Sequence, residues 1–96
     1  MSRLRVRTVT PLGRYRVRLV LSNGREVERD LEQLFVGPVF EPLRVSDACF
    51  GAVRVEAGTL VWPGDIDLDP DVLIWGRAEP KDQLEPPATM RLHVPA

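Results

Sequence analysis

The sequence has few of the residues that would cross-link a small protein through disulfides, anchor it in a membrane or bind a metal ion. One cysteine among 96 residues rules out a disulfide within the chain, whereas a small secreted domain normally needs several. No apolar run approaches the roughly 20 residues that cross a bilayer, and the chain does not start like a signal peptide. One histidine and one cysteine also exclude a zinc site built from this chain alone. We therefore expect a cytoplasmic protein with no membrane segment.

Signatures of catalysis are equally scarce. Cys49 lies between Ala48 and Phe50, where a small buried hydrophobic residue is expected, and nothing in the sequence brings His93 to it. The sequence has no glycine-rich phosphate-binding loop and no visible constellation of acid, base and nucleophile. We expect no cofactor and no enzymatic activity.

Charge is balanced over the whole chain but not along it. The formal net charge is −1 and 44% of the residues are hydrophobic, which is typical of one small globular domain. Residues 1–29 hold eight arginines against two glutamates, whereas residues 30–96 hold five basic against twelve acidic residues. Packing of the two parts against each other would explain this division without any partner.

The first third of the chain predicts a three-stranded antiparallel meander. Residues 4–10 alternate between inward positions and arginines, residues 11–13 form a turn, and a second alternating strand ends at Ser22-Asn23-Gly24. A two-residue Asn-Gly loop would mismatch both faces of the next pairing. A three-residue loop matches them, with four predicted pairs: Leu19 with Val27, Tyr15 with Leu31, Arg18 with Glu28 and Arg16 with Asp30.

The middle of the chain predicts short turns and a crossing segment. Asp30 with Gln33 resembles a capping box for a helical turn that ends at Gly37-Pro38. Residues 39–45 are expected to be extended, with Phe40 and Leu43 buried. Ser46 or Asp47 can then cap another short turn.

A second hairpin and a helix follow. Residues 53–62 alternate around a turn at Gly58-Thr59, and Pro63-Gly64 is expected to end the pairing. Asp69 fits an N-cap, with Pro70 in the first helical position, and the helix is predicted to run from Pro70 to Trp75 and to end at Gly76.

These elements predict an α+β fold. We expect a small single domain over residues 1–76, with a three-stranded N-terminal meander, a second antiparallel β-hairpin and short helices, followed by a Pro-rich C-terminal arm over residues 77–96. Residues 89–94 alternate again and could form a strand in the domain's own sheet, a strand in a neighbour's sheet, or a disordered end. A strand swapped between two copies would give a homodimer.

Four carboxylates lie between the two tryptophans, at Asp65, Asp67, Asp69 and Asp71. An EF-hand calcium loop requires glycine at position 6 and glutamate at position 12, but counting from Asp65 places Pro70 and Gly76 there. The spacing instead favours turn and helix-cap chemistry, with Ile66 and Leu68 packed inward. A weak, irregular cation site is the alternative.

The tryptophans and the acidic run together form the predicted partner-binding set. We expect at least one tryptophan to pack in the core, whereas an exposed one would be an anchor for a protein partner. The residues of this set are Trp62, Asp65, Asp67, Asp71 and Trp75.

Six arginines of the first two strands define a predicted basic face: Arg3, Arg5, Arg7, Arg14, Arg16 and Arg18. Such a face could meet a phosphate backbone or an acidic protein. However, Glu26, Glu28 and Asp30 fall on the same face in the preferred register, and no aromatic residue is interleaved for base stacking. A solvated or internally paired face is therefore favoured, with protein binding next and nucleic-acid binding last.

Several motifs occur in an order that characterises one bacterial family. They are Gly37, Phe40 and Leu43, then Asp47 and Phe50, Val53 and Val55, Leu60-Val61-Trp62-Pro63-Gly64, and finally Asp65, Asp67, Asp69-Pro70-Asp71 and Leu73. Upstream, Ser22-Asn23-Gly24 and Asp30-Leu31 fit the same pattern. Over residues 14–76 the chain resembles the family catalogued as domain of unknown function 2442.

The resemblance implies a small α+β domain, usually without known catalytic residues. Some members carry an added helix-turn-helix domain, and their genes often lie beside a second small gene, as in a toxin and antitoxin pair. No helix-turn-helix segment follows Gly76 in these residues, which counts against direct DNA recognition. We expect a protein-interaction or regulatory module, antitoxin-like, with a small protein partner. The alternative is a small nucleic-acid-binding protein that uses the arginine face.

Overall fold

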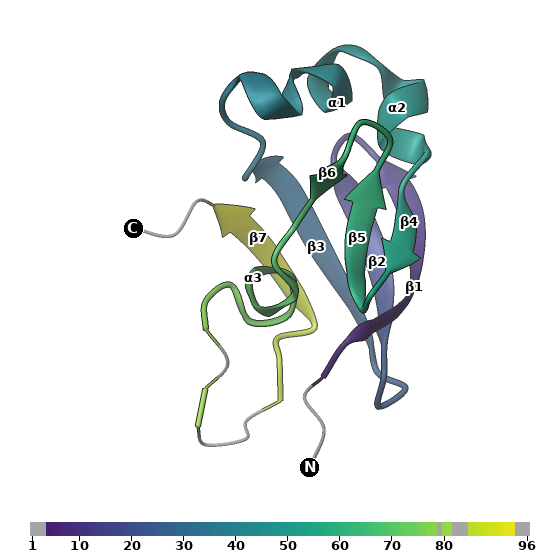
Figure 1. Ribbon diagram of the computed structural model, residues 1–96. Coiled ribbons are helices and arrows are strands. Elements are labelled where there is room, and N and C mark those ends of the chain that lie inside the picture. Colours follow the sequence, from purple (N-terminus) through teal and green to yellow (C-terminus); the bar gives the residue numbers. More distant parts are fainter. Residues whose placement is uncertain (1–3, 79, 82–84, 94–96) are drawn as a thin grey trace.

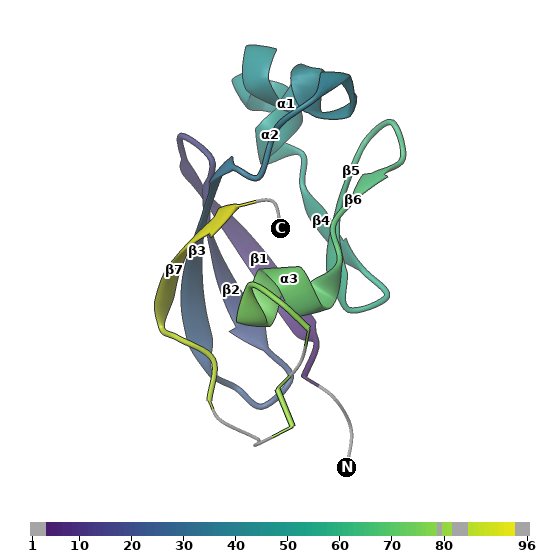
Figure 2. The same ribbon diagram turned by 90° about the vertical axis from the view of Figure 1, so that its left-hand side faces the viewer.

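Two open β-sheets form the two layers of the fold. The computed structural model describes residues 4–78, 80–81 and 85–93. One sheet has four strands in the order β1-β2-β3-β7, and the other has three in the order β4-β5-β6. The two sheets lie in separate layers, and α1 and α2 cover one end of the molecule (Figures 1 and 2). This arrangement confirms the predicted α+β class.

The elements have the following bounds. The four-stranded sheet is built from β1 (Val6–Gly13), β2 (Arg16–Leu21), β3 (Glu26–Gln33) and β7 (Thr89–His93). The three-stranded sheet is built from β4 (Arg54–Glu56), β5 (Thr59–Trp62) and β6 (Ile66–Asp67). The helices are the 3-10 turn η1 (Pro38–Phe40) and α1 (Glu41–Val45), α2 (Asp47–Gly51) and α3 (Pro70–Trp75).

The predicted register of the β2–β3 hairpin is confirmed. Three of the predicted pairs are direct Cα partners: Leu19 with Val27, Arg18 with Glu28 and Arg16 with Asp30. The backbone of the fourth pair is also joined, because Leu31 N donates to Tyr15 O at 2.7 Å. Matching the faces across the three-residue loop was therefore enough to find the pairing.

Strand β1 is longer and less regular than predicted. It runs through Pro11 to Gly13, as an edge strand allows, and a bulge between Val6 and Thr8 changes which side faces the core. Val9, rather than the predicted Thr8, packs against the core. The alternation of residues 4–10 is therefore broken by the bulge.

The first turn also lies later than predicted. Arg14 and Tyr15 form it, both with positive φ (43° and 67°), a conformation that non-glycine residues rarely adopt. The Tyr15 ring packs edge-on against Phe35 and Phe50, with ring centroids 5.8 Å apart in each case. These contacts offset the cost of the turn.

The prediction of a capping box at Asp30 is wrong, because β3 continues to Gln33. Pairing with β2 on one side and β7 on the other satisfies the backbone of β3 and outweighs a weak local signal. The carboxylate of Asp30 accepts from Glu32 N within the strand. One turn follows, in which Phe35 N donates to Leu31 O.

Residues 39–45 are helical rather than extended, which corrects a second prediction. They belong to η1 and α1, and the Arg44 guanidinium fastens this segment by donating to Phe35 O at 2.7 Å and to Gly37 O at 3.1 Å. Leu43 is buried as expected, and half-buried Phe40 stacks on Phe35. Ser46 is the cap of α2, since its hydroxyl accepts from Cys49 N.

The second hairpin turns one residue earlier than predicted and does not end at Pro63-Gly64. The turn is at Ala57-Gly58, and β6 pairs back on β5 with Trp62 opposite Ile66. The predicted bounds of α3, Pro70–Trp75, are confirmed. Asp69 accepts from Asp71 N at 2.8 Å, and Gly76 ends the helix in the left-handed conformation at φ 74°.

Strand β7 joins the domain's own sheet, in parallel with β3. Of the three alternatives for residues 89–94, the strand in the domain's own sheet is therefore the one that holds for residues 89–93. Val94 lies outside the described residues. The division of the chain at residue 76 stays a prediction. Pro86, just before β7, is buried, so this part of the arm is packed against the domain.

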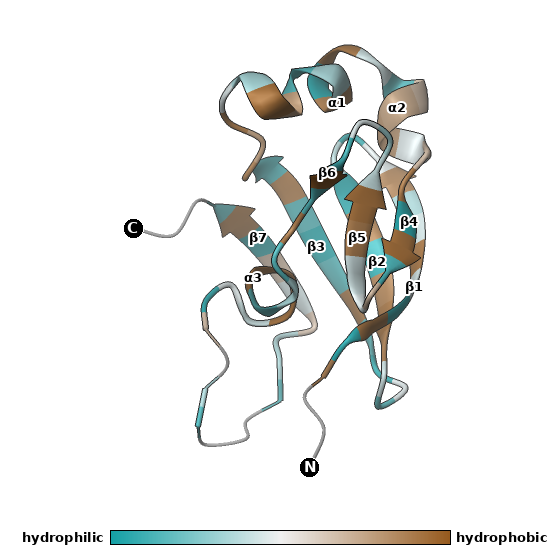
Figure 3. Cartoon of the chain, viewed as in Figure 1, coloured by the Kyte–Doolittle hydropathy of each residue, from teal (hydrophilic) through white to brown (hydrophobic). Residues whose placement is uncertain are grey.

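The core lies between the two layers. Hydrophobic and hydrophilic positions alternate along the strands of the four-stranded sheet (Figure 3). Five of the six aromatic residues contact one another in a single cluster: Tyr15, Phe35, Phe40, Phe50 and Trp62. None of the helices in the described part of the chain is long and apolar enough to cross a membrane.

Candidate functional site

The acidic run forms a hairpin turn and a helix start. Asp65 lies in the β5–β6 turn, Asp67 points outward from β6, and Asp69 caps α3, while Ile66 and Leu68 are buried. Leu68 is held to β5 because its N donates to Leu60 O and its carbonyl accepts from the Thr59 hydroxyl. Turn and cap contacts therefore account for the positions of this run. Among the residues that the structure describes, no three His, Cys, Asp or Glu side chains are grouped so that they could hold a metal ion.

The predicted partner-binding residues are divided between surface and core. Asp65 and Asp67 are exposed, and Asp71 and Trp75 are half-buried. Trp62 is 0% exposed, and its indole N–H donates to Phe50 O at 2.9 Å. The expectation that at least one tryptophan packs in the core is confirmed. The surface part of the set is thus an acidic edge of the three-stranded sheet that continues into α3.

The predicted basic face is not one continuous stripe. Arg3 lies outside the described residues, and Arg14 lies in the β1–β2 turn. Arg5, just before β1, and Arg7, within it, bond to nearby backbone: Arg5 donates to Leu4 O at 2.9 Å, and Arg7 donates to Ser22 O at 3.0 Å. Only Arg16 and Arg18 lie together in the middle of the sheet.

The outer face of the four-stranded sheet interleaves arginines with carboxylates. Arg18 lies 3.4 Å from Glu28, and Arg91 lies 4.0 Å from Asp30. Because Arg16 is the Cα partner of Asp30 on its other side, one row across β2, β3 and β7 reads basic, acidic, basic. A shallow hollow of about 350 Å³ lies over these strands, lined by Arg16, Glu28, Arg29, Asp30, Thr89, Met90 and Arg91.

One arginine lies on the inner face, and sequence reasoning missed it. Arg29 is 1% exposed, and it donates to three carbonyls: Leu73 O at 2.6 Å, Ile74 O at 2.8 Å and Glu28 O at 2.7 Å. Two of these carbonyls belong to the last turn of α3, the negative end of the helix dipole. Desolvation lowers the pKa of Arg29 to about 10, so the guanidinium stays charged at neutral pH.

The signal for Arg29 was present in the predicted register. Val27 and Leu31 were both placed inward, and a residue midway between them in a strand must share their side. Arg29 therefore joins β3 to the end of α3, and its role is structural.

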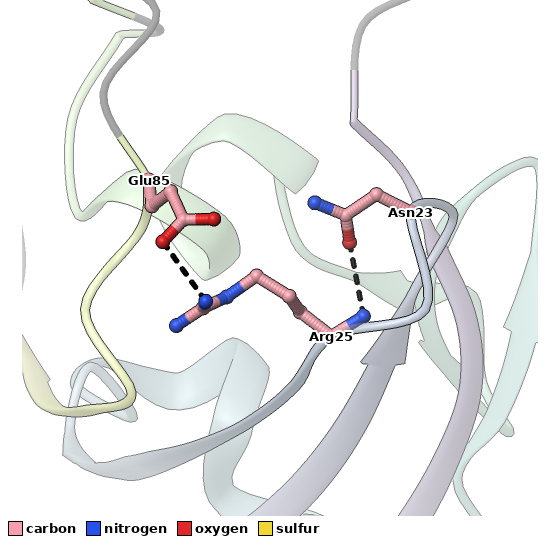
Figure 4. Close-up of polar contacts among 3 residues, drawn as sticks. All are labelled: Asn23, Arg25 and Glu85. Atoms are coloured by element: carbon pink, nitrogen blue, oxygen red, sulfur yellow. Dashed lines mark hydrogen bonds and ion pairs between the residues drawn. The ribbon is translucent and has the colours of Figure 1, made fainter.

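A polar contact also joins the segment before β7 to the β2–β3 loop. Arg25 lies 2.9 Å from the carboxylate of Glu85, and its backbone N–H donates to the Asn23 side chain at 3.0 Å (Figure 4). Both side chains of the ion pair are partly exposed, so the pair adds little stability by itself.

In the part of the chain that the structure describes, three large apolar side chains are well exposed, and all lie within ten residues at the helical end of the molecule. Val36 is 55% exposed, Val39 is 60% exposed and Val45 is 76% exposed. The segment that carries them includes η1 and α1. We call these residues the valine surface.

Comparison with protein families finds a match over most of the chain. The family described as Protein of unknown function (DUF2442) matches residues 6–79, which include every element from β1 to α3 and leave β7 outside. Neither the curated proteins nor the solved structures contain a match to this chain. Because the match spans well over half of the chain, the protein belongs to the DUF2442 family.

Proposed function

We propose that this protein is a non-enzymatic protein-interaction module that regulates a small protein partner. The observation that carries the proposal is the valine surface. Single exposed hydrophobic residues are ordinary, whereas exposed apolar side chains that lie together mark sites of protein contact, and these three fall within ten residues of the chain. Burying such side chains at an interface removes apolar area from water and favours association.

The segment that carries the valine surface is held in place before any partner arrives. Arg44, near the end of the segment, donates to Phe35 O and Gly37 O at its beginning and so ties the two ends together. Phe40 also stacks on Phe35, with ring centroids 5.2 Å apart. A surface that is already ordered loses less conformational entropy on binding. The geometry therefore supports a preformed docking site rather than a segment that folds on contact.

The family resemblance gives the proposal its specific form. In this form, the protein is the antitoxin-like member of a gene pair and binds a toxin-like protein encoded nearby. The exposed carboxylates of Asp65 and Asp67 would add an acidic contact surface for a basic partner.

The outer face of the sheet supports a protein partner over a nucleic acid. Arg16 and Arg18 share that face with Glu28 and Asp30, so their charge is offset close to where a phosphate backbone would lie.

The experiment is purification of the tagged full-length chain from its native host, followed by mass spectrometry. We expect a stoichiometric small protein that no longer co-purifies with a variant carrying Val36→Thr, Val39→Thr and Val45→Thr. These changes keep the side-chain shape but replace one methyl group with a hydroxyl, and because the sites are exposed, stability should change by less than about 0.5 kcal/mol each.

The matched control carries isoleucine at the same three positions and should retain the partner, because the surface stays apolar. Recovery of nucleic acid alone, with a steep dependence of binding on salt, would contradict the proposal. Undiminished binding of the partner by the threonine variant would show that the valine surface does not carry the interaction.

A further inference from the structure

We propose that the free edge of β7 is a second binding site, which accepts an extended strand of another protein with acidic residues on one side and apolar residues on the other. This site is separate from the valine surface and does not depend on it. It would extend the four-stranded sheet by one strand, a known mode of peptide recognition.

Two residues of β7, Thr89 and Arg91, present backbone groups on the side of the strand away from β3. Glu28 N donates to Ala88 O at 2.7 Å, and Thr89 is the Cα partner of Glu28 in a parallel pair. Along a strand, the backbone N–H and C=O groups of successive residues point to opposite sides. Those of Met90 therefore point toward β3, and those of Thr89 and Arg91 point away from it. Among the described residues, no strand pairs with that side of β7. The edge is therefore a template for one more strand.

The inner side of this edge favours apolar residues in the incoming strand. Leu92 is 1% exposed and packs in the core, and half-buried Met90 is packed against it. The end of α3 reaches this point too, since a Cβ added at Gly76 would lie 2.8 Å from the Met90 sulfur. An apolar side chain beside Met90 would extend this packed layer.

The outer side favours acidic residues. Across β2, β3 and β7 the row of Arg16, Asp30 and Arg91 alternates in charge and ends with a base at the open edge. The Arg91 side chain is 68% exposed and lies 4.0 Å from Asp30, so it can contact a further carboxylate. Opposite charges on neighbouring strands stabilise a pairing, and like charges oppose it.

A second copy of this chain is the poorer occupant. Two β7 strands related by a two-fold axis would pair in antiparallel fashion. In the registers that pair most of Thr89–His93, Arg91 lies opposite or diagonal to Arg91 of the other copy. This repulsion favours a different protein with an acidic strand.

The test uses two synthetic peptides and the isotope-labelled full-length protein. One peptide alternates valine and glutamate over seven residues, and the other has lysine in place of each glutamate. In NMR titrations the glutamate peptide should shift the amides of residues 89–93 most and bind at least about fivefold more tightly than the lysine peptide. The variant Arg91→Glu should reverse this preference, and because the site is exposed it should fold normally.

Two further variants complete the design. Thr89→Pro removes an outward N–H and no bond to β3, so it should abolish binding of the glutamate peptide. Arg14→Glu makes the same change in charge at the β1–β2 turn and should leave the preference unaltered. The proposal is overturned by equal binding of the two peptides, by shifts centred away from β7, or by a preference that Arg91→Glu leaves unchanged. It is also overturned by a wild-type dimer that Thr89→Pro dissociates, because the occupant would then be a second copy.

Discussion

The two faces of the four-stranded sheet both carry arginine, with opposite physical consequences. On the outer face Arg16, Arg18 and Arg91 are exposed among carboxylates. On the inner face Arg29 is buried, and it donates to carbonyls at the end of α3. Arginines on neighbouring strands are thus exposed to water on one face of the sheet and buried on the other.

The difference teaches that the number of arginines does not identify a functional face. An exposed ion pair gains little, because water and salt screen it. A buried guanidinium loses its hydration, but charge-assisted hydrogen bonds to three carbonyls offset that loss, and two of these carbonyls are groups that the end of the helix leaves unpaired. We therefore expect the arginine most important for stability to be Arg29, which the predicted basic face did not include.

The largest expected effect comes from removing an apolar side chain of the inner face. Leu19→Ala should lower the free energy of unfolding by about 2–5 kcal/mol, because Leu19 is fully buried and its loss leaves a cavity. Urea unfolding measures this change. The control is Val20→Ala on the same strand, which is only half-buried and should cost under about 1.5 kcal/mol. Equal losses would show that the two faces do not differ in burial.

Arg29→Met should come next, with a loss of about 2–3 kcal/mol in urea unfolding. The variant leaves the carbonyls of Leu73 and Ile74 buried without their donor, although it also removes the cost of burying the charge. Arg29→Lys should be destabilised as well, because an ammonium group cannot reproduce the planar arrangement of donors. If Arg29→Met is as stable as the wild type, the buried arginine makes no net contribution to the fold.

The pH dependence of Arg29 separates it from an ion pair. Desolvation lowers its pKa to about 10, so below that pH the folded and unfolded states both hold the proton. The stability difference between wild type and Arg29→Met should therefore be constant between about pH 6 and pH 9. Above pH 10 the unfolded state binds the proton more tightly than the folded state, so the contribution of Arg29 to stability rises with pH. A difference that falls between pH 6 and pH 4 would instead indicate a carboxylate partner.

Gly76→Ala probes the contact between α3 and the inner side of β7, with a smaller effect. Gly76 has φ 74°, and an added Cβ would lie 2.8 Å from the flexible Met90 side chain. We expect a loss of about 1–2 kcal/mol in urea unfolding, mainly from backbone strain. Gly51→Ala is the control, because nothing lies within 4 Å of its added Cβ and its φ is not positive, so that variant should be neutral or up to about 1 kcal/mol more stable.

The outer face should give the smallest effect. A double-mutant cycle on Arg18 and Glu28 should yield a coupling of about 0.2–1 kcal/mol at low salt, which 1 M salt largely removes. The destabilisation by Arg29→Met should change little over the same range of salt. A coupling above about 2 kcal/mol would mean that the outer face is as important to stability as the inner one.

Predictions from the sequence succeeded where the signal was short-range. The β2–β3 register followed from matching both faces across the loop, and α3 followed from Asp69, Pro70 and Gly76. One failed where distant segments compete. At Asp30 a local capping pattern was outweighed by strand pairing on both sides of β3. The prediction at Pro63-Gly64 failed for a local reason, because the next strand, β6, pairs back on β5.

The candidate surfaces divide in the same way. The sequence indicated that the aspartates of the acidic run serve turns and a cap, and it indicated carboxylates among the outer arginines. It did not indicate that Val39 and Val45 would be exposed, since residues 39–45 were expected to be extended rather than helical, and it gave no signal for the exposure of Val36. Nor did it distinguish Trp62 in the core from half-buried Trp75.

By itself, the sequence determined the fold class, the central register, the last helix and the family, because each depends on residues that are close in the chain or that match along it. Only the tertiary structure decided the bulge in β1, the parallel addition of β7 and the bonds of Arg29 to the end of α3. These features depend on contacts between segments far apart in the sequence. The free energy of such contacts comes from burial and from satisfied backbone groups, and no local pattern of residues contains it.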